Sequence, residues 1–184
     1  MTTLTGRDKS ALLVIDVQNG VVEGAYDLQN VLKNINAAID KARAAGVPVV
    51  WVQHSDEELI IDSEAWQIVP ELVPSDGEAM VRKIYRSSFE GTNLEEILAG
   101  LQVGHVFITG MQTNNCVRHT THSAQERGYD VTVLADAHST TGYDWDGHTV
   151  VAKDVVDEFN DNFGGTELPG RFTRAIAAAK LKFG

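Results

Sequence analysis

The 184-residue sequence contains a single cysteine, Cys116, so no disulfide can form within the chain. It also has few basic residues, with 15 Lys and Arg against 26 Asp and Glu, which gives a formal net charge of −11 at pH 7. Nucleic acids and anionic membranes repel such a chain, so neither is expected as a partner. No apolar run approaches the roughly 20 residues that span a bilayer. The first ten residues lack an apolar signal core, so a cytoplasmic location is expected.

The residues that are present fit a globular α/β protein. Hydrophobic residues make up 43% of the chain, and we expect one domain over residues 1–184. Continuous apolar runs predict strands at 11–16, 47–53, 105–110 and 129–136, with a weaker strand at 78–83. Helical spacing of apolar residues predicts helices at 28–46 and 114–128. This alternation predicts a three-layer α-β-α, Rossmann-like fold with a mostly parallel central sheet.

The remaining segments have weaker patterns. Residues 54–74 read as an irregular excursion over one end of the sheet. The segments 147–163 and 171–181 are each predicted to form a helix.

Three chemically distinct side chains follow three of the predicted strands. Asp16 ends the first strand, Lys83 ends the weaker strand, and Cys116 comes six residues after Gly110 ends another. Since the carboxyl ends of parallel strands share one edge of the sheet, the three side chains are expected in one cleft. Taken singly, each has an ordinary structural explanation, and their convergence is what indicates catalysis.

A carboxylate, an ammonium and a thiol in one cleft suit nucleophilic catalysis. A helix N-terminus and Lys83 would both favour the thiolate of Cys116. Asp16 would accept the thiol proton and return it to a leaving amine. Free backbone N–H groups at the start of the helix would form an oxyanion hole.

Three stretches of the sequence also resemble a known family. ALLVIDVQNG, VRKIYRSSFEGTNLEEIL and VFITGMQTNNCVRHTTHSAQERGYDVTVLADAHST resemble, in this order, the signature blocks of the isochorismatase-like cysteine hydrolases. That family includes nicotinamidases, N-carbamoylsarcosine amidases and ureidoacrylate amidohydrolases. The resemblance implies the isochorismatase-like hydrolase fold, a catalytic triad of Asp16, Lys83 and Cys116, and a homo-oligomer, either a dimer or a tetramer.

The resemblance extends to the surroundings of the cysteine. It implies a cis peptide bond between Gln112 and Thr113, with the N–H groups of Thr113 and Cys116 forming the oxyanion hole. For substrate binding we assign Gln18 and two aromatic side chains that could line a pocket, Trp66 and Phe89.

No metal or other cofactor is expected. Many nicotinamidases carry an Asp-x-His metal site after the second strand, but here His54 and Asp56 stand in the opposite order. His119 and His122 are spaced i, i+3, and no further ligand cluster accompanies them. The glycine-rich phosphate-binding motifs of nucleotide-binding proteins are absent.

These features predict a hydrolase that cleaves a C–N bond of a small amide, carbamoyl or ureido substrate through a thioester on Cys116. Two alternatives remain open. One is vinyl-ether hydrolysis of an isochorismate-type substrate, with Asp16 as the acid. The other is a non-catalytic oligomeric binding module on the same fold.

Overall fold

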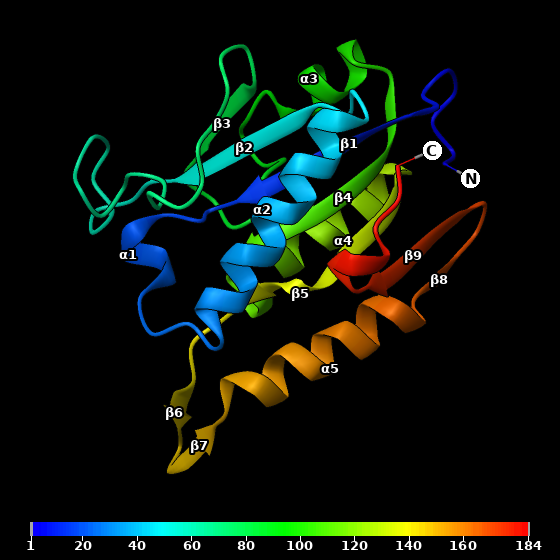
Figure 1. The fold of residues 1–184 in the computed structure, drawn as a ribbon. Helices are drawn as coiled ribbons and strands as arrows, with labels where there is room; N and C mark the ends of the chain where they lie inside the picture. Colours follow the sequence, from blue (N-terminus) through cyan, green and yellow to red (C-terminus); the bar gives the residue numbers. More distant parts are fainter. Residues whose placement is uncertain (1, 184) are drawn as a thin grey trace.

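The computed structural model describes residues 2–183, and these residues form a central sheet between layers of helices (Figure 1). Within them, the main sheet has seven strands in the order β3-β2-β1-β4-β5-β9-β8. All neighbouring strands are parallel except β8 and β9. The strands are β1 (Lys9–Ile15), β2 (Val49–His54), β3 (Ala79–Lys83), β4 (Val103–Met111), β5 (Asp130–Ser139), β8 (Glu167–Leu168) and β9 (Arg171–Ile176).

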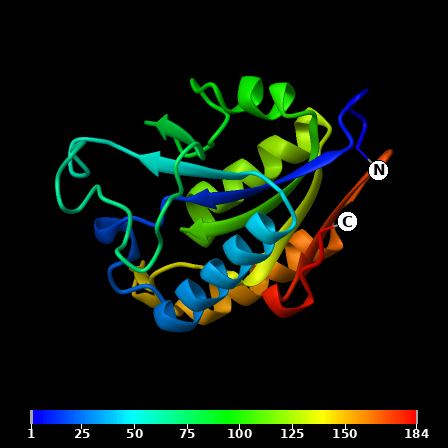
Figure 2. The ribbon, with the colours of Figure 1, turned by 45° about the horizontal axis from the view of Figure 1, so that its top comes forward.

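The helices cover both faces of this sheet. They are α1 (Asn19–Val22), α2 (Leu28–Ala44), α3 (Leu94–Gly100), the π-helical turn η1 (Thr113–Val117), α4 (Arg118–Arg127), α5 (Ala152–Gly165) and the 3₁₀ turn η2 (Ala178–Lys180). Helix α2 and η2 pack on one face, and α3, α4 and α5 pack on the other. Figure 2 shows α2 and α3 on opposite sides of the strands. The expected three-layer α-β-α arrangement with a mostly parallel sheet is confirmed.

Strand β1 shows why the layers form. Its side chains alternate between the two faces, so Leu12 and Val14 join the core beneath α2, while Leu13 and Ile15 join the core beneath α3 and α4. None of the four is more than 1% exposed. A strand buried on both faces requires a continuous apolar sequence, which is what the run 11–15 supplies.

The C-terminal region differs from the prediction. Residues 171–181 were expected to form a helix, but they form β9 followed by η2. Strand β9 pairs with β5 from Val131↔Thr173 to Leu134↔Ile176. That pairing satisfies backbone groups that β5 would otherwise expose, and it overrides the helical preference of the alanine-rich sequence.

A second difference lies just before α5. A two-stranded hairpin of β6 (Tyr143–Trp145) and β7 (His148–Val150) occupies the start of the predicted helix 147–163, so α5 begins at Ala152. Figure 1 shows this hairpin projecting away from the main sheet.

None of the helices in residues 2–183 combines the length and the apolar character that a membrane span requires.

The order of the strands positions the functional site. The chain lays β2 and β3 on one side of β1 and then places β4 and β5 on the other side. In such sheets a crevice opens at the carboxyl ends of the strands where the order reverses, here between β1 and β4. Gly110 near the end of β4 lets the two strands approach, because it has φ +117° and a Cβ there would lie 2.0 Å from the carbonyl oxygen of Ile15.

Candidate active site

The three residues expected to act together lie at this carboxyl edge. Asp16 directly follows β1, with φ 51° and its backbone N–H donated to Val52 O at 2.9 Å. Lys83 is the last residue of β3, and its register partner is His54 at the end of β2. Cys116 lies in η1, the tight turn that follows β4. Parallel strands thus deliver all three side chains to one place, as the sequence pattern predicts.

The distances show direct contact. Lys83 Nζ lies 2.6 Å from Asp16 Oδ2 and donates a hydrogen bond to Cys116 Sγ at 3.3 Å. The side chains of Asp16 and Lys83 are 1% and 0% exposed, whereas Cys116 is half-buried. The ammonium of Lys83 therefore bridges the carboxylate and the thiol, and of the three groups the thiol is the most accessible to a ligand.

Burial dominates the electrostatics of Asp16. Desolvation raises the pKa of this carboxyl above its ordinary value, while Lys83, Cys116 and His54 each act to lower it. The net effect is a carboxylate that remains paired with an ammonium but holds a proton more readily than an exposed aspartate. Such a group is suited to accept and return a proton.

The thiol differs from the sequence-based expectation. Burial raises the pKa of Cys116 to about 12, the negative charge of Asp16 adds to the rise, and Lys83 opposes it. The raised pKa favours the neutral thiol at pH 7 over the thiolate that Lys83 and the helix N-terminus were expected to favour. Its proton must leave as the sulfur attacks, and the adjacent Asp16 carboxylate is the acceptor.

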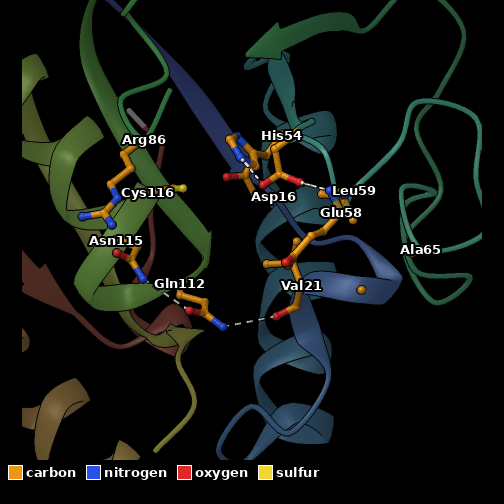
Figure 3. A pocket seen from close by; sticks show the side chains of 12 residues that line it. Asp16, Val21, His54, Glu58, Leu59, Ala65, Arg86, Gln112, Asn115 and Cys116 are labelled. Carbon is orange, nitrogen blue, oxygen red and sulfur yellow. Dashed lines mark hydrogen bonds and ion pairs between the residues drawn. The ribbon is translucent and has the colours of Figure 1, made fainter. Parts of the chain in front are cut away.

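A cavity of about 420 Å³ opens over the sulfur. Its walls come from Asp16 and helix α1, from residues 54–65, from Arg86, and from Gln112 and η1, as Figure 3 shows. Asp56 and Glu58 lie on one side, and Arg86 lies on the side of Cys116. Within residues 2–183, Arg86 has no hydrogen bond or ion pair, so its charge is available to a ligand.

The three predicted substrate-binding residues do not line this cavity, and that assignment is corrected. Gln18 is fully buried, and its Nε2 donates to His54 O at 3.0 Å and to Trp66 O at 2.8 Å. These bonds link the end of β2 to the loop that follows it. Trp66 is 5% exposed, with the Arg82 guanidinium over its ring. Phe89 is 6% exposed and packs against Tyr129 in the core beneath α3 and α4.

The expected cis peptide bond also needs correction. It joins Met111 to Gln112, one bond before the predicted Gln112–Thr113 position. Strand β4 ends at Met111, so the cis bond lies where the chain leaves the sheet, before η1 begins. Thr113 is fully buried and its hydroxyl contacts His138 Nδ1 at 2.8 Å, whereas Gln112 and Cys116 line the cavity.

Several residues of the site were not assigned a role from the sequence. His54, Asp56, Glu58 and Arg86 all line the cavity. The available signal for His54 was its place at the end of a buried strand, the same criterion that identified Asp16 and Lys83. Within the described part of the chain, no group of three His, Cys, Asp or Glu side chains is arranged to hold a metal ion.

Comparisons with known proteins identify the family of this chain. The isochorismatase domain family matches residues 10–163. The chain is 34% identical over 135 residues to the secreted isochorismatase effector Isc1 of Verticillium dahliae, covering 70% of this chain and 71% of that protein.

Two crystal structures share the fold. An isochorismatase from Pseudomonas putida superposes with a TM-score of 0.86 at 23% identity, covering 94% of this chain and 90% of that one. N-carbamoylsarcosine amidase from Thermoplasma acidophilum superposes with a TM-score of 0.72 at 24% identity, covering 95% and 99%. With the family match over most of its length, this chain belongs to the isochorismatase-like family of hydrolases.

Proposed function

We propose that this hydrolase cleaves a C–N bond of a small amide, carbamoyl or ureido substrate, with Cys116 as the nucleophile. The observation that carries the proposal is the contact of one buried ammonium, on Lys83, with both the Asp16 carboxylate and the Cys116 sulfur at the floor of the cavity. Burying a charged pair costs the folded state desolvation energy, and ionisable groups with perturbed pKa values cluster at functional sites.

The first half of the reaction forms a thioester. The Cys116 sulfur bonds to the substrate carbonyl carbon while its proton passes to Asp16. Lys83 stabilises the negative charge that builds on the sulfur, because its Nζ is 3.3 Å away. The C–N bond then breaks, and the proton held by Asp16 goes to the departing nitrogen.

The second half releases the product. Asp16, again a carboxylate, takes a proton from a water molecule as that water attacks the thioester carbon. The C–S bond breaks, and the proton on Asp16 passes to the sulfur, which regenerates the Cys116 thiol and the Asp16 carboxylate. In both halves the oxyanion needs backbone donors beside the sulfur, and we assign this role to the N–H groups of Gln112 and Cys116, since both residues line the cavity.

The cavity limits the substrate to a small molecule. A volume of about 420 Å³ accommodates a compact ligand and excludes a folded polypeptide. The opposed charges of Arg86 and Glu58 suit a polar ligand. The presence of an N-carbamoylsarcosine amidase on the same fold supports the C–N assignment.

A second candidate is vinyl-ether hydrolysis. The family match and the raised pKa of Asp16 favour it, because a carboxyl that retains its proton can protonate a vinyl ether. In that reaction Cys116 would have no covalent role. The third possibility, a binding module without catalysis, leaves the Asp16–Lys83–Cys116 contacts without a purpose.

One panel of assays separates these candidates. Wild type and Cys116→Ala are compared on neutral, anionic and cationic small amides, N-carbamoyl amino acids and ureides, with release of ammonia or amine measured, and on isochorismate. The proposal predicts turnover of at least one C–N substrate that is lost in Cys116→Ala. Equal cleavage of isochorismate by both proteins, with no C–N substrate turned over, would establish the second candidate instead.

A further inference from the structure

The ammonium of Lys83 has a third partner besides Asp16 and Cys116. An ammonium carries three N–H donors and no acceptor. Lys83 Nζ lies 2.6 Å from Asp16 Oδ2, 3.3 Å from Cys116 Sγ and 3.2 Å from His54 Nδ1. Its side chain is 0% exposed, so these three acceptors together satisfy all three donors without solvent.

The contact with Lys83 fixes the state of the imidazole. Because the ammonium can only donate, Nδ1 of His54 must present its lone pair, and the ring proton of a neutral imidazole then resides on Nε2. His54 Nε2 lies 3.2 Å from Asp56 Oδ2, so the N–H on Nε2 is donated to that carboxylate (Figure 3).

Both ends of this chain of contacts are anchored. Asp56 Oδ1 accepts the backbone N–H groups of Glu58 at 2.9 Å and Leu59 at 2.7 Å, and these bonds hold the pKa of Asp56 below its usual range. The His54 backbone is held by Gln18, whose Oε1 accepts its N–H at 2.8 Å. The imidazole is therefore oriented from the loop side and from the strand side.

We propose that His54 is a positioning residue for catalysis: as a neutral imidazole oriented by Asp56, it fixes the Lys83 ammonium between Asp16 and Cys116. This inference rests on the proposed function, because it assigns His54 an effect on the reacting groups through Lys83. It also connects the cavity wall at residues 56–59 with the catalytic lysine, since Asp56 belongs to both.

A matched pair of variants tests whether the hydrogen-bond acceptor at Nδ1 of His54 is what matters. His54→Asn and His54→Leu have nearly the same shape, but only asparagine offers an oxygen near the place of Nδ1. On a substrate of the wild-type enzyme, His54→Leu is expected to lower kcat about 100-fold with little change in KM, and His54→Asn to recover most of that loss. Equal kcat values for wild type, His54→Asn and His54→Leu would overturn the proposal.

A substrate-independent measurement separates this inference from the proposed function. Cys116 is the only cysteine, so iodoacetamide reports on it alone. At pH 8.5 its alkylation should be slower in His54→Leu than in His54→Asn, because Lys83 no longer stabilises the thiolate as well. That difference without Cys116-dependent turnover of any amide would retain the role of His54 and reject the amidase. Cys116-dependent turnover of an amide, with the same alkylation rate and the same kcat in His54→Leu and His54→Asn, would retain the amidase and reject the role of His54.

Discussion

Lys83 Nζ lies 2.6 Å from Asp16 Oδ2, and neither side chain is more than 1% exposed. The two residues come from the carboxyl ends of strands β3 and β1, which are separated in the sheet by β2. Removing one member of a buried pair leaves the other charge without a partner, which typically costs about 3–5 kcal/mol.

The first prediction concerns the stability of this pair. Lys83→Met should lower the free energy of unfolding at pH 7 by about 3 kcal/mol, because Asp16 is left buried and either ionised without a partner or protonated at a cost. Adding Asp16→Asn to Lys83→Met should recover part of this loss, while activity stays absent. Urea denaturation of the two single variants and the double variant checks it. Strictly additive changes would show that the pair is not coupled.

The second prediction concerns the acid limb of activity. The pKa of Asp16 is raised by burial, so the carboxylate needed to accept the thiol proton is lost at a higher pH than an ordinary aspartate would be. As pH falls through this raised pKa, kcat/KM should decline, starting above the ordinary aspartate value of about 4. A pH–rate profile of kcat/KM measures this. A profile flat down to pH 4 would exclude Asp16 as the base.

The third prediction concerns the reactivity of the thiol. Burial and the charge of Asp16 raise the pKa of Cys116, and Lys83 lowers it. Asp16→Asn should therefore speed alkylation by iodoacetamide at pH 7 by about tenfold although it abolishes turnover, and Lys83→Met should slow alkylation. Mass spectrometry of the alkylated protein gives both rates. Slower alkylation in Asp16→Asn would mean that the carboxylate assists thiolate formation even without substrate.

The fourth prediction concerns stability against pH. Burial lowers the pKa of His138 to about 4 from an ordinary 6.5, with Asn160 and Asp136 opposing the shift. Between these values the unfolded chain binds a proton that the folded chain does not. Stability should therefore fall as pH drops from 6.5 to 4, with His138 accounting for about 3 kcal/mol, and lose nothing more from this group below pH 4.

A variant isolates this contribution. His138→Gln should be less stable than wild type at pH 7, because the ring accepts and donates in contacts with Thr113 and Asn160. Its decline between pH 6.5 and pH 4 should nevertheless be smaller than that of wild type. The remaining decline includes His105, whose pKa burial also lowers to about 4. Urea denaturation at several pH values measures the decline in stability of both proteins. Equal declines would contradict the assignment to His138.

The sequence was sufficient to predict strands β1 to β5 of the main sheet and the meeting of Asp16, Lys83 and Cys116 at one edge of it. Strands buried on both faces have continuous apolar sequences, and their carboxyl ends must share an edge, so Asp16, Lys83 and Cys116 could be brought together from pattern alone. His54 obeys the same rule, but it was considered only as a metal ligand. Its role emerged from the distance to Lys83, which depends on the register between β2 and β3.

The failures have a common physical cause. Residues 171–181 were predicted as a helix, yet β9 forms there because β5 presents an edge that only the folded sheet reveals. Trp66 and Phe89 were placed in the cavity by residue type, whereas their depth depends on how the 54–77 segment and the segment after Lys83 pack. Such outcomes are set by long-range contacts, which local propensity does not encode.

The most direct measurement is the rate of ammonia or amine release by Cys116→Ala relative to wild type, on a C–N substrate that the wild type hydrolyses. Alanine removes only the sulfur, and thermal melting would verify that the fold is retained. The account predicts that turnover falls to the uncatalysed background while substrate binding persists. Turnover by Cys116→Ala at a rate close to that of wild type would contradict it.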